Sequence, residues 1–145
     1  MEKNSTELTL ARQAARAGAA QVRRFFGQAI KSEMKENNKG IVTRADKSSE
    51  ASIIEYLQSR STFGILSEES GALGTATGPI WVIDPLDGTT NFSHRLPLFA
   101  VSIALMHGDA FHIGVIVNPV TGDEYYAESG KGAFKNGKKL QTTRF

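Results

Sequence analysis

The sequence predicts an α+β fold in which two N-terminal helices pack on a largely antiparallel sheet. Residues 5–31 carry small and apolar side chains at helical spacing, and residues 47–60 repeat that pattern. From residue 99 onward, short apolar segments alternate with turn signals such as Asn118-Pro119 and Asn136-Gly137, which is typical of strands joined by hairpins. Helices followed by such a meander form a layered α+β domain.

The first half of the chain is expected to begin with one long amphipathic helix over residues 5–31. Asn4 followed by Glu7 resembles a capping box at its start, and the polar stretch Glu33–Gly40 predicts a loop at its end. The helical spacing is carried by Leu8, Ala11, Ala15, Val22, Phe26 and Ile30.

The second helix is expected between two short strands. Ile41-Val42-Thr43 is the first strand candidate, and Asp46 is a good N-cap for a helix over 47–60. Phe63–Ser67 predicts an apolar strand, and the glycine-rich segment 71–79 predicts a surface loop. Later strands are expected at Phe99–Met106, Phe111–Asn118, Glu124–Ala127 and Ala133–Lys135.

Composition limits the classes of protein to which the chain can belong. Its 145 residues, 40% hydrophobic and 22% charged, fit one soluble globular domain with its own core. The absence of cysteine excludes disulfides, cysteine-bound zinc and thiol nucleophiles. The net charge of +2 comes from scattered basic residues and does not indicate nucleic acid. Without a leader or an apolar run of membrane length, a cytoplasmic location is expected.

The most informative segment is residues 81–92, Trp-Val-Ile-Asp-Pro-Leu-Asp-Gly-Thr-Thr-Asn-Phe. The apolar run Ile80–Ile83 predicts a buried strand that ends in two carboxylates, Asp84 and Asp87. Carboxylates at the end of a rigid strand are ligands for hard cations such as Mg²⁺. Gly88 follows at an expected helix start, where backbone N–H groups attract phosphate. The segment therefore predicts a metal-dependent site for a phosphorylated substrate.

Five carboxylates are expected at the ends of elements: Asp46, Glu68, Glu69, Asp84 and Asp87. Each also has an ordinary interpretation, as a helix cap, a solvated pair or a turn residue. If the strands that precede Glu68 and Asp84 are neighbours, however, like charges converge at one edge of the sheet. Such convergence is costly unless a cation neutralises it, and two metal ions can activate water and stabilise a leaving oxygen.

The segment Asp84–Phe92 resembles the first signature of the inositol monophosphatase family, which belongs to the lithium-sensitive, Mg²⁺-dependent sugar phosphatases. Val42–Asp46 resembles the family's V-T-x-x-D, Leu66–Ser70 resembles its G-E-E-S, and Phe99–Leu105 matches the strand that follows the signature. The Thr-Thr-Asn-Phe ending is most similar to inositol monophosphatase and the bacterial SuhB-like enzymes. The resemblance implies the N-terminal part of a layered α/β/α/β/α fold.

This resemblance implies a set of metal ligands and a cofactor. The family's ligands fall on the side chains of Glu68, Asp84 and Asp87 and on the backbone carbonyl of Leu86. The implied cofactor is Mg²⁺, with two or three ions in the intact family. Glu69, the neighbour of a ligand, has no implied primary metal role.

The resemblance also implies the catalytic groups and the reaction. The catalytic residues would be Asp46, Glu68 and Thr89, of which Asp46 and Thr89 orient the attacking water and help to deprotonate it. The backbone N–H groups of Gly88 and Thr89 would bind phosphate, and Lys35 matches a family lysine near the active site. The implied reaction is hydrolysis of inositol 1-phosphate by in-line attack of metal-activated water, without a covalent intermediate.

The resemblance covers only part of the family pattern. Residues 1–145 are expected to form the N-terminal metal-binding domain, without the C-terminal half that carries a W-D motif; the only tryptophan here is Trp81. The chain alone is therefore expected to be weakly active or inactive. Two alternatives stay open: a non-catalytic interaction module, and a phosphatase for fructose 1,6-bisphosphate, a 3′-phosphonucleotide or histidinol phosphate. A small phosphorylated polyol is the expected partner, and the family commonly forms homodimers.

Overall fold

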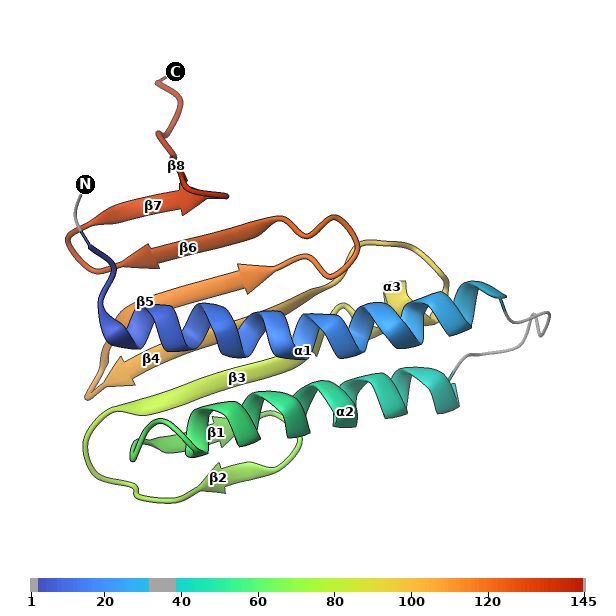
Figure 1. Ribbon diagram of the computed structural model, residues 1–145, viewed down its shortest axis with the longest axis horizontal. Helices are drawn as coiled ribbons and strands as arrows, with labels where there is room; N and C mark the ends of the chain where they lie inside the picture. The colour runs from blue at the N-terminus through green and yellow to red at the C-terminus, as the bar shows by residue number, and fades with distance from the viewer. Residues whose placement is uncertain (1–2, 32–38, 145) are drawn as a thin grey trace.

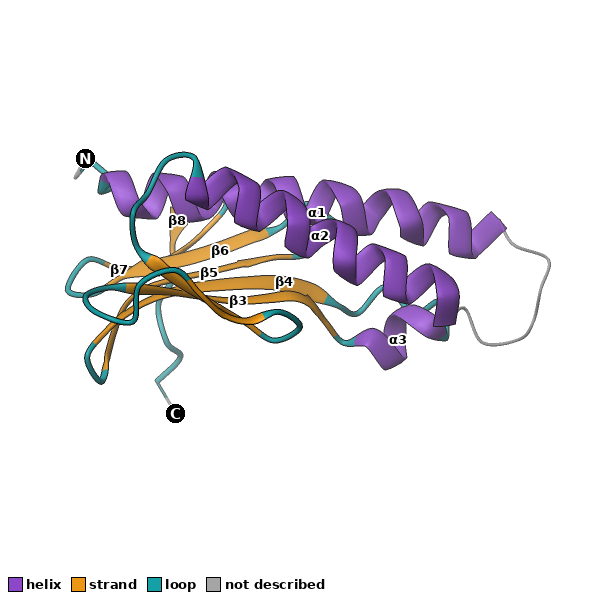
Figure 2. Cartoon of the chain, turned by 90° about the horizontal axis from the view of Figure 1, so that it is seen from below, coloured by secondary structure: helices purple, strands orange, loops and turns teal. Residues whose placement is uncertain are grey.

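The computed structural model describes residues 3–31 and 39–144 and places two long helices on one face of a sheet (Figure 1). Helix α1 spans Thr6–Lys31, and helix α2 spans Lys39–Gln58. Figure 2 shows both helices on the same side of the strands, side by side. This arrangement confirms the predicted α+β class.

The sheet of the described residues has eight strands in the order β2-β1-β3-β4-β5-β6-β7-β8. Strands β1 and β3 are parallel, whereas all the other neighbouring pairs are antiparallel. The short helix α3, Thr89–Ser93, lies between β3 and β4 in the chain. The strands are β1 Gly64–Ser67, β2 Gly71–Leu73, β3 Ile80–Asp87, β4 Ala100–His107, β5 Ala110–Val117, β6 Glu124–Glu128, β7 Gly132–Lys135 and β8 Lys138–Lys139.

The strands after residue 99 and the strand after α2 are confirmed to within one residue at each end. The expected loop over 71–79 is wrong at its start, because β2 pairs with β1 and places Gly71 opposite Ser67. Gly71 has a φ of 69°, so the tight reversal between the two strands uses a conformation that glycine adopts without strain. Strand β8 has only two residues and was not predicted.

Helix α1 is capped by Ser5 rather than by Asn4. The Oγ of Ser5 accepts a hydrogen bond from the backbone N–H of Leu8 at 3.1 Å, which satisfies one of the free donors of the first turn. The predicted apolar face is buried along most of the helix, at Leu8, Ala11, Ala15, Val22 and Phe26. Only Ile30, in the last turn, is exposed, at 54%.

Helix α2 begins earlier than predicted, so the strand expected at Ile41-Val42-Thr43 and the N-cap expected at Asp46 are both wrong. β-Branched residues favour strands locally. Here packing decides instead, because four fully buried residues recur every fourth position along α2, namely Ala45, Ser49, Ile53 and Leu57. Asp46 therefore lies inside the helix, where it caps nothing.

The core lies between the helices and the sheet and includes an aromatic cluster near α3. The ring centroids of Phe26, Phe92 and Phe99 lie 4.8–5.4 Å apart, the separation at which tilted aromatic rings attract each other. Phe92 and Phe99 are both buried. Leu96 and Leu98, although apolar and close in sequence, are 48% and 66% exposed.

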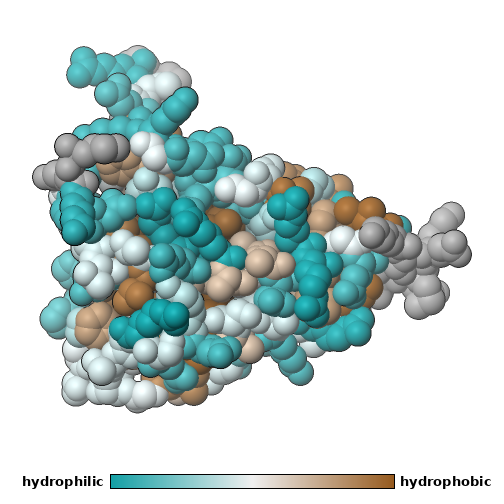
Figure 3. All heavy atoms as spheres, in the orientation of Figure 1, coloured by the Kyte–Doolittle hydropathy of each residue, from teal (hydrophilic) through white to brown (hydrophobic). Residues whose placement is uncertain are grey.

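The opposite face of the sheet is not covered by α1 or α2 (Figure 2). Ile116 and Tyr125 are paired across β5 and β6 and are 47% and 38% exposed. By contrast, the surface seen from the helix side is mostly hydrophilic, with scattered apolar residues (Figure 3). Among the described residues, none of the helices is both long and apolar enough to cross a membrane.

Candidate functional site

The parallel pairing of β1 and β3 brings the acidic residues that follow them to one edge of the sheet. Ser67 lies opposite Ile83 in the register, and the backbone N–H of Glu68 donates a hydrogen bond to the carbonyl of Ile83 at 3.3 Å. Glu68 and Asp84 therefore lie at the same level of two adjacent strands. The condition that the sequence left open, that these two strands are neighbours, is met.

Strand β3 does not end at Ile83 as predicted but continues through Asp87. Its pairing with β4 is irregular between Asp84 and Asp87, the stretch that contains Pro85, which has no N–H to donate. Pro85 and Leu86 are buried, whereas Asp87 is exposed. The two aspartates thus flank an irregular part of the strand rather than follow its end.

Asp46 reaches the same site from α2, although it lies far from β3 in sequence. Its residue exposure is 9%. Burial, the charge of Glu69, a hydrogen bond with Glu69 and the charges of Asp84 and Glu68 raise the pKa of Asp46 to about 7. The structure therefore brings Asp46 together with three of the other four carboxylates that the sequence singled out.

Asp84 is similarly perturbed from the sheet side of the site. Burial, a hydrogen bond with Glu68 and the charges of Glu68 and Asp87 raise the pKa of Asp84 to about 7, despite a backbone hydrogen bond at Leu86 that lowers it. Raised carboxylate pKa values of this origin are common where like charges share one site.

The donor set fits a hard cation. The Oδ1 atoms of Asp46 and Asp84 are buried without a hydrogen-bond partner, and leaving such an oxygen buried and unpaired costs free energy. As the side chains stand in the described residues, no three Asp, Glu, His or Cys groups are arranged to hold a metal ion. Glu68 raises the pKa of Asp84, and Glu69 that of Asp46, and a bound cation would neutralise these converging like charges.

Gly88 begins α3 in the left-handed conformation, with φ 91° and ψ 37°. A Cβ at this position would lie 2.9 Å from the carbonyl oxygen of Leu98, so both the backbone angle and the close approach require glycine. The N-cap of helix α3 is Gly88, and the helix has no side-chain cap hydrogen bond. Thr89 and Thr90 are exposed beside Asp87.

A group of polar side chains that sequence reasoning missed lies behind the carboxylates. Glu50 is buried on α2 and accepts hydrogen bonds from Ser67 and Ser70, at the two ends of the turn that carries Glu68 and Glu69. The only signal in the sequence is the spacing of Asp46, Ser49 and Glu50, which places all three on one side of a helix. The interpretation of Asp46 as the N-cap hid this pattern, because it placed Asp46 before the helix and not on one of its faces.

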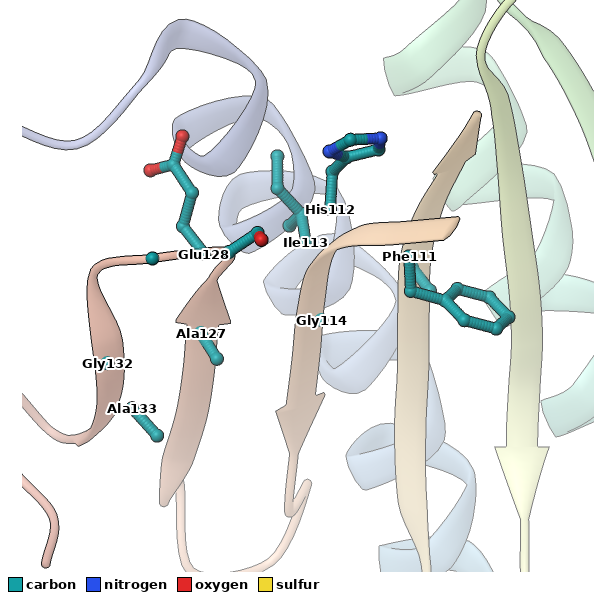
Figure 4. Close-up of a pocket in the computed structure, with 11 residues that line it drawn as sticks. Phe111, His112, Ile113, Gly114, Ala127, Glu128, Gly132 and Ala133 are labelled. Carbon is teal, nitrogen blue, oxygen red and sulfur yellow. The ribbon is translucent and has the colours of Figure 1, made fainter. Parts of the chain in front are cut away.

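Two further features do not form part of the site as the structure describes it. Lys35, the lysine singled out by the family resemblance, lies outside the described residues. A hollow of 560 Å³ opens over β4–β7, where Gly114, Ala127 and Ala133 line it (Figure 4). None of the five carboxylates lines this hollow.

Comparisons with known proteins agree with this fold. A sequence profile of the inositol monophosphatase family matches residues 3–144. An inositol-1-monophosphatase of Caulobacter vibrioides is 43% identical over 133 residues, which are 88% of this chain and 51% of that protein. Human inositol monophosphatase 1 is 40% identical over 126 residues, 81% of this chain and 46% of the human protein.

Solved structures extend the comparison to three dimensions. The extragenic suppressor protein suhB of Bartonella henselae superposes with a TM-score of 0.83 at 35% identity, covering 96% of this chain and 55% of that one. The chain described here belongs to the inositol monophosphatase family. It spans about half the length of the curated relatives it matches.

Proposed function

We propose that this chain carries the metal- and phosphate-binding part of a Mg²⁺-dependent phosphate monoesterase whose substrate is inositol 1-phosphate. The observation that carries the proposal is the convergence of carboxylates from α2, the turn after β1, and β3, with buried unpaired oxygens on Asp46 and Asp84. Relatives about 40% identical to this chain are named inositol-1-monophosphatases, which supports the choice of substrate.

The proposed metal ligands are Glu68, Asp84 and Asp87, with the backbone carbonyl of Leu86. Glu68 and Asp84 share one level of the sheet, and Leu86 lies between the two aspartates in the irregular part of β3. When bound, Mg²⁺ would neutralise the carboxylates, lower the pKa of water and polarise the phosphoryl oxygens. Asp84, whose pKa is raised to about 7, would bind the cation in its ionised state.

The remaining residues would act on water and on the phosphate. Asp46, buried on α2 beside Asp84, would accept a proton from the attacking water, which Thr89 would help to orient. The backbone N–H groups of Gly88 and Thr89 would bind phosphate oxygens, because Gly88 has no Cβ and leaves its backbone accessible. Lys35 is proposed as a further group near the phosphate.

We further propose that residues 1–145 act as the N-terminal metal-binding domain of this phosphatase fold. The family profile matches nearly the whole chain, while the relatives are about twice as long as the matched region.

The test compares the chain with two single-residue variants. Phosphate release from inositol 1-phosphate is measured during a Mg²⁺ titration, with and without Li⁺, together with the thermal midpoint of unfolding. In Asp84→Asn we expect loss of turnover, by roughly 100-fold or more, and loss of the Mg²⁺-induced rise in midpoint. Asp109→Asn, an exposed turn residue between β4 and β5, is the matched control and should behave like the unmodified chain.

Two results would count against the proposal. If Asp84→Asn keeps both turnover and its response to Mg²⁺, the metal assignment is wrong. If the unmodified chain is folded but shows no response to Mg²⁺, it is not a metal-binding part, and the non-catalytic interaction module becomes the better interpretation. A folded chain that binds Mg²⁺ without releasing phosphate would instead fit a metal-binding part without a complete catalytic site. Faster release from fructose 1,6-bisphosphate than from inositol 1-phosphate would instead reassign the substrate.

A further inference from the structure

A buried carboxylate on α2, Glu50, contacts the turn that carries two of the acidic residues of the site. Its residue exposure is 8%. Its Oε2 accepts hydrogen bonds from the backbone N–H of Ser70, at 3.2 Å, and from the hydroxyl of Ser67, while its Oε1 accepts one from the hydroxyl of Ser70. Both oxygens are therefore satisfied, and both contact one short segment, the turn Ser67–Ser70.

The same side of α2 also contacts β3. Ser49 is fully buried and donates a hydrogen bond from its hydroxyl to the carbonyl of Pro85 at 2.8 Å. Pro85 directly follows Asp84 in the irregular part of the strand. Asp46, Ser49 and Glu50 are three and four residues apart and so lie on one side of the helix. One helical face thus contacts both the turn that carries Glu68 and Glu69 and the irregular part of β3 between Asp84 and Asp87.

We propose that Glu50, assisted by Ser49, is a positioning residue that holds the turn Ser67–Ser70 so that Glu68 and Glu69 face Asp84 and Asp46. Glu68, Glu69 and Ser70 are exposed, so burial does not fix the turn. Without Glu50, the turn would depend on the hydrogen bond from Glu68 to Ile83 and on the pairing of β2 with β1.

The importance of this arrangement for Mg²⁺ rests on the proposed function, whereas the geometry of the turn does not. Groups that orient metal ligands typically change metal affinity or activity by roughly 10- to 100-fold when they are removed. Glu50 makes no contact with the Asp46 and Asp84 oxygens that lack partners, so it acts through the turn and not as a ligand.

Three variants and one control separate geometry from charge. Glu50→Ala removes all the contacts. Glu50→Gln keeps one acceptor oxygen for Ser67 and the Ser70 N–H, and its amide group can donate to the Ser70 hydroxyl. Ser70→Ala removes a single contact at an exposed residue, so it leaves the core intact. Glu55→Ala, an exposed carboxylate on the same helix, is the matched control.

The first measurement is amide hydrogen exchange in the metal-free chain, and the second is the apparent dissociation constant for Mg²⁺. In Glu50→Ala, the Glu68 amide should exchange faster by on the order of tenfold, while amides of the buried strand β4 keep their rates. The Mg²⁺ constant should rise by roughly 10- to 100-fold. Ser70→Ala should show smaller changes in the same direction, and Glu50→Gln and Glu55→Ala should resemble the unmodified chain.

The proposal is overturned if Glu68 exchange is unchanged in both Glu50→Ala and Ser70→Ala. It is also overturned if Glu50→Gln is as impaired as Glu50→Ala, because the charge of Glu50 would then matter rather than its hydrogen bonds. If all amides exchange faster in Glu50→Ala because the whole fold is weakened, exchange of the Glu68 amide in Ser70→Ala tests the proposal instead. An unmodified chain that binds no Mg²⁺ refutes the proposed function, but it leaves the exchange result on the turn intact.

Discussion

Asp46 and Asp84 hold their protons more tightly than isolated aspartates, because burial and neighbouring carboxylates disfavour the ionised form. One side-chain oxygen of each aspartate is also buried and unpaired. Without a bound cation, ionisation of these carboxyl groups therefore destabilises the folded chain. The loss of stability grows as the groups ionise, so it can be followed by changing the pH.

We predict that the metal-free chain loses stability as the pH rises from about 5 to about 7.5. The folded-state pKa of each aspartate, about 7, lies above the ordinary value of 3.8. Its contribution to stability is therefore fully present below pH 3.8 and is lost as the pH rises through 7. The thermal midpoint of unfolding, measured by circular dichroism in a chelating buffer, should fall across this interval.

The pH interval begins at about 5 because two other carboxylates affect stability at lower pH. Asp123 and Glu128 have lowered pKa values, so their contributions change on the acid side of the ordinary carboxyl range. Asp84→Asn should flatten the decline above about pH 5, because one of the two perturbed groups no longer ionises. A midpoint that is constant or rises between about pH 5 and 7.5 in the unmodified chain would contradict the assignment.

At the scale of elements, the close packing of α1 on α2 determines where the α2 carboxylates lie. Gly18 is the point of contact, since a Cβ there would lie 2.7 Å from Cδ1 of Ile53 and 2.7 Å from Oγ of Ser49. Both neighbours are fully buried, so neither has free space into which to move. A side chain at residue 18 would therefore push α2 away from α1 and disturb the hydrogen bond of Ser49 to Pro85.

We predict that Gly18→Ala destabilises the fold by about 1–3 kcal/mol, because it overpacks a filled interface. Gly27→Ala is the matched control, since it lies in the same helix and its Cβ would meet nothing within 4 Å. That substitution should stabilise the chain by about 0.5–1 kcal/mol, the difference in helix propensity. Urea unfolding measures both, and equal effects of the same sign would show that the helices are not closely packed at Gly18.

The sequence was informative about elements whose local pattern and packing agree, and it failed where they disagree. Strands β4 to β7 are short apolar segments between strong turn signals, so their positions were predicted to within one residue. Ile41-Val42-Thr43 has a local preference for strand, but its place in α2 is set by burial further along the helix. Leu96 and Leu98 are apolar, yet no periodicity showed which side they face.

The candidate site was predictable in its acidic residues but not in its supports. Glu68 and Asp84 each follow an apolar run, which is visible in one sequence, whereas their convergence depends on the parallel pairing of β1 with β3. Glu50 lies seventeen or more residues from its hydrogen-bond partners. A single sequence carries no signal for such a pairing between a helix and a distant turn.

At the scale of the whole molecule, α1 is joined to the far half of the sheet by one buried carboxylate on β6. Glu124 accepts hydrogen bonds from the Nε atoms of Arg12 and Arg16, the latter at 2.7 Å, across more than a hundred residues of sequence. The Glu124 side chain is 7% exposed, the Arg12 side chain 20% and the Arg16 side chain 55%. The guanidinium of Arg12 also lies 3.9 Å from the ring centroid of Tyr126.

We predict that the two arginines contribute unequally to the free energy of unfolding. Arg12→Ala removes a largely buried hydrogen bond to a charged group together with a cation–π contact, so it should cost about 2–3 kcal/mol. Arg16→Ala should cost less than about 1 kcal/mol, because its side chain is mostly solvated and Arg12 still pairs with Glu124. Urea unfolding at low and high salt measures both, and only the Arg16 contribution should shrink as salt is added. Equal losses would mean that Glu124 is solvated in solution, and α1 would then be held on the sheet by apolar packing alone.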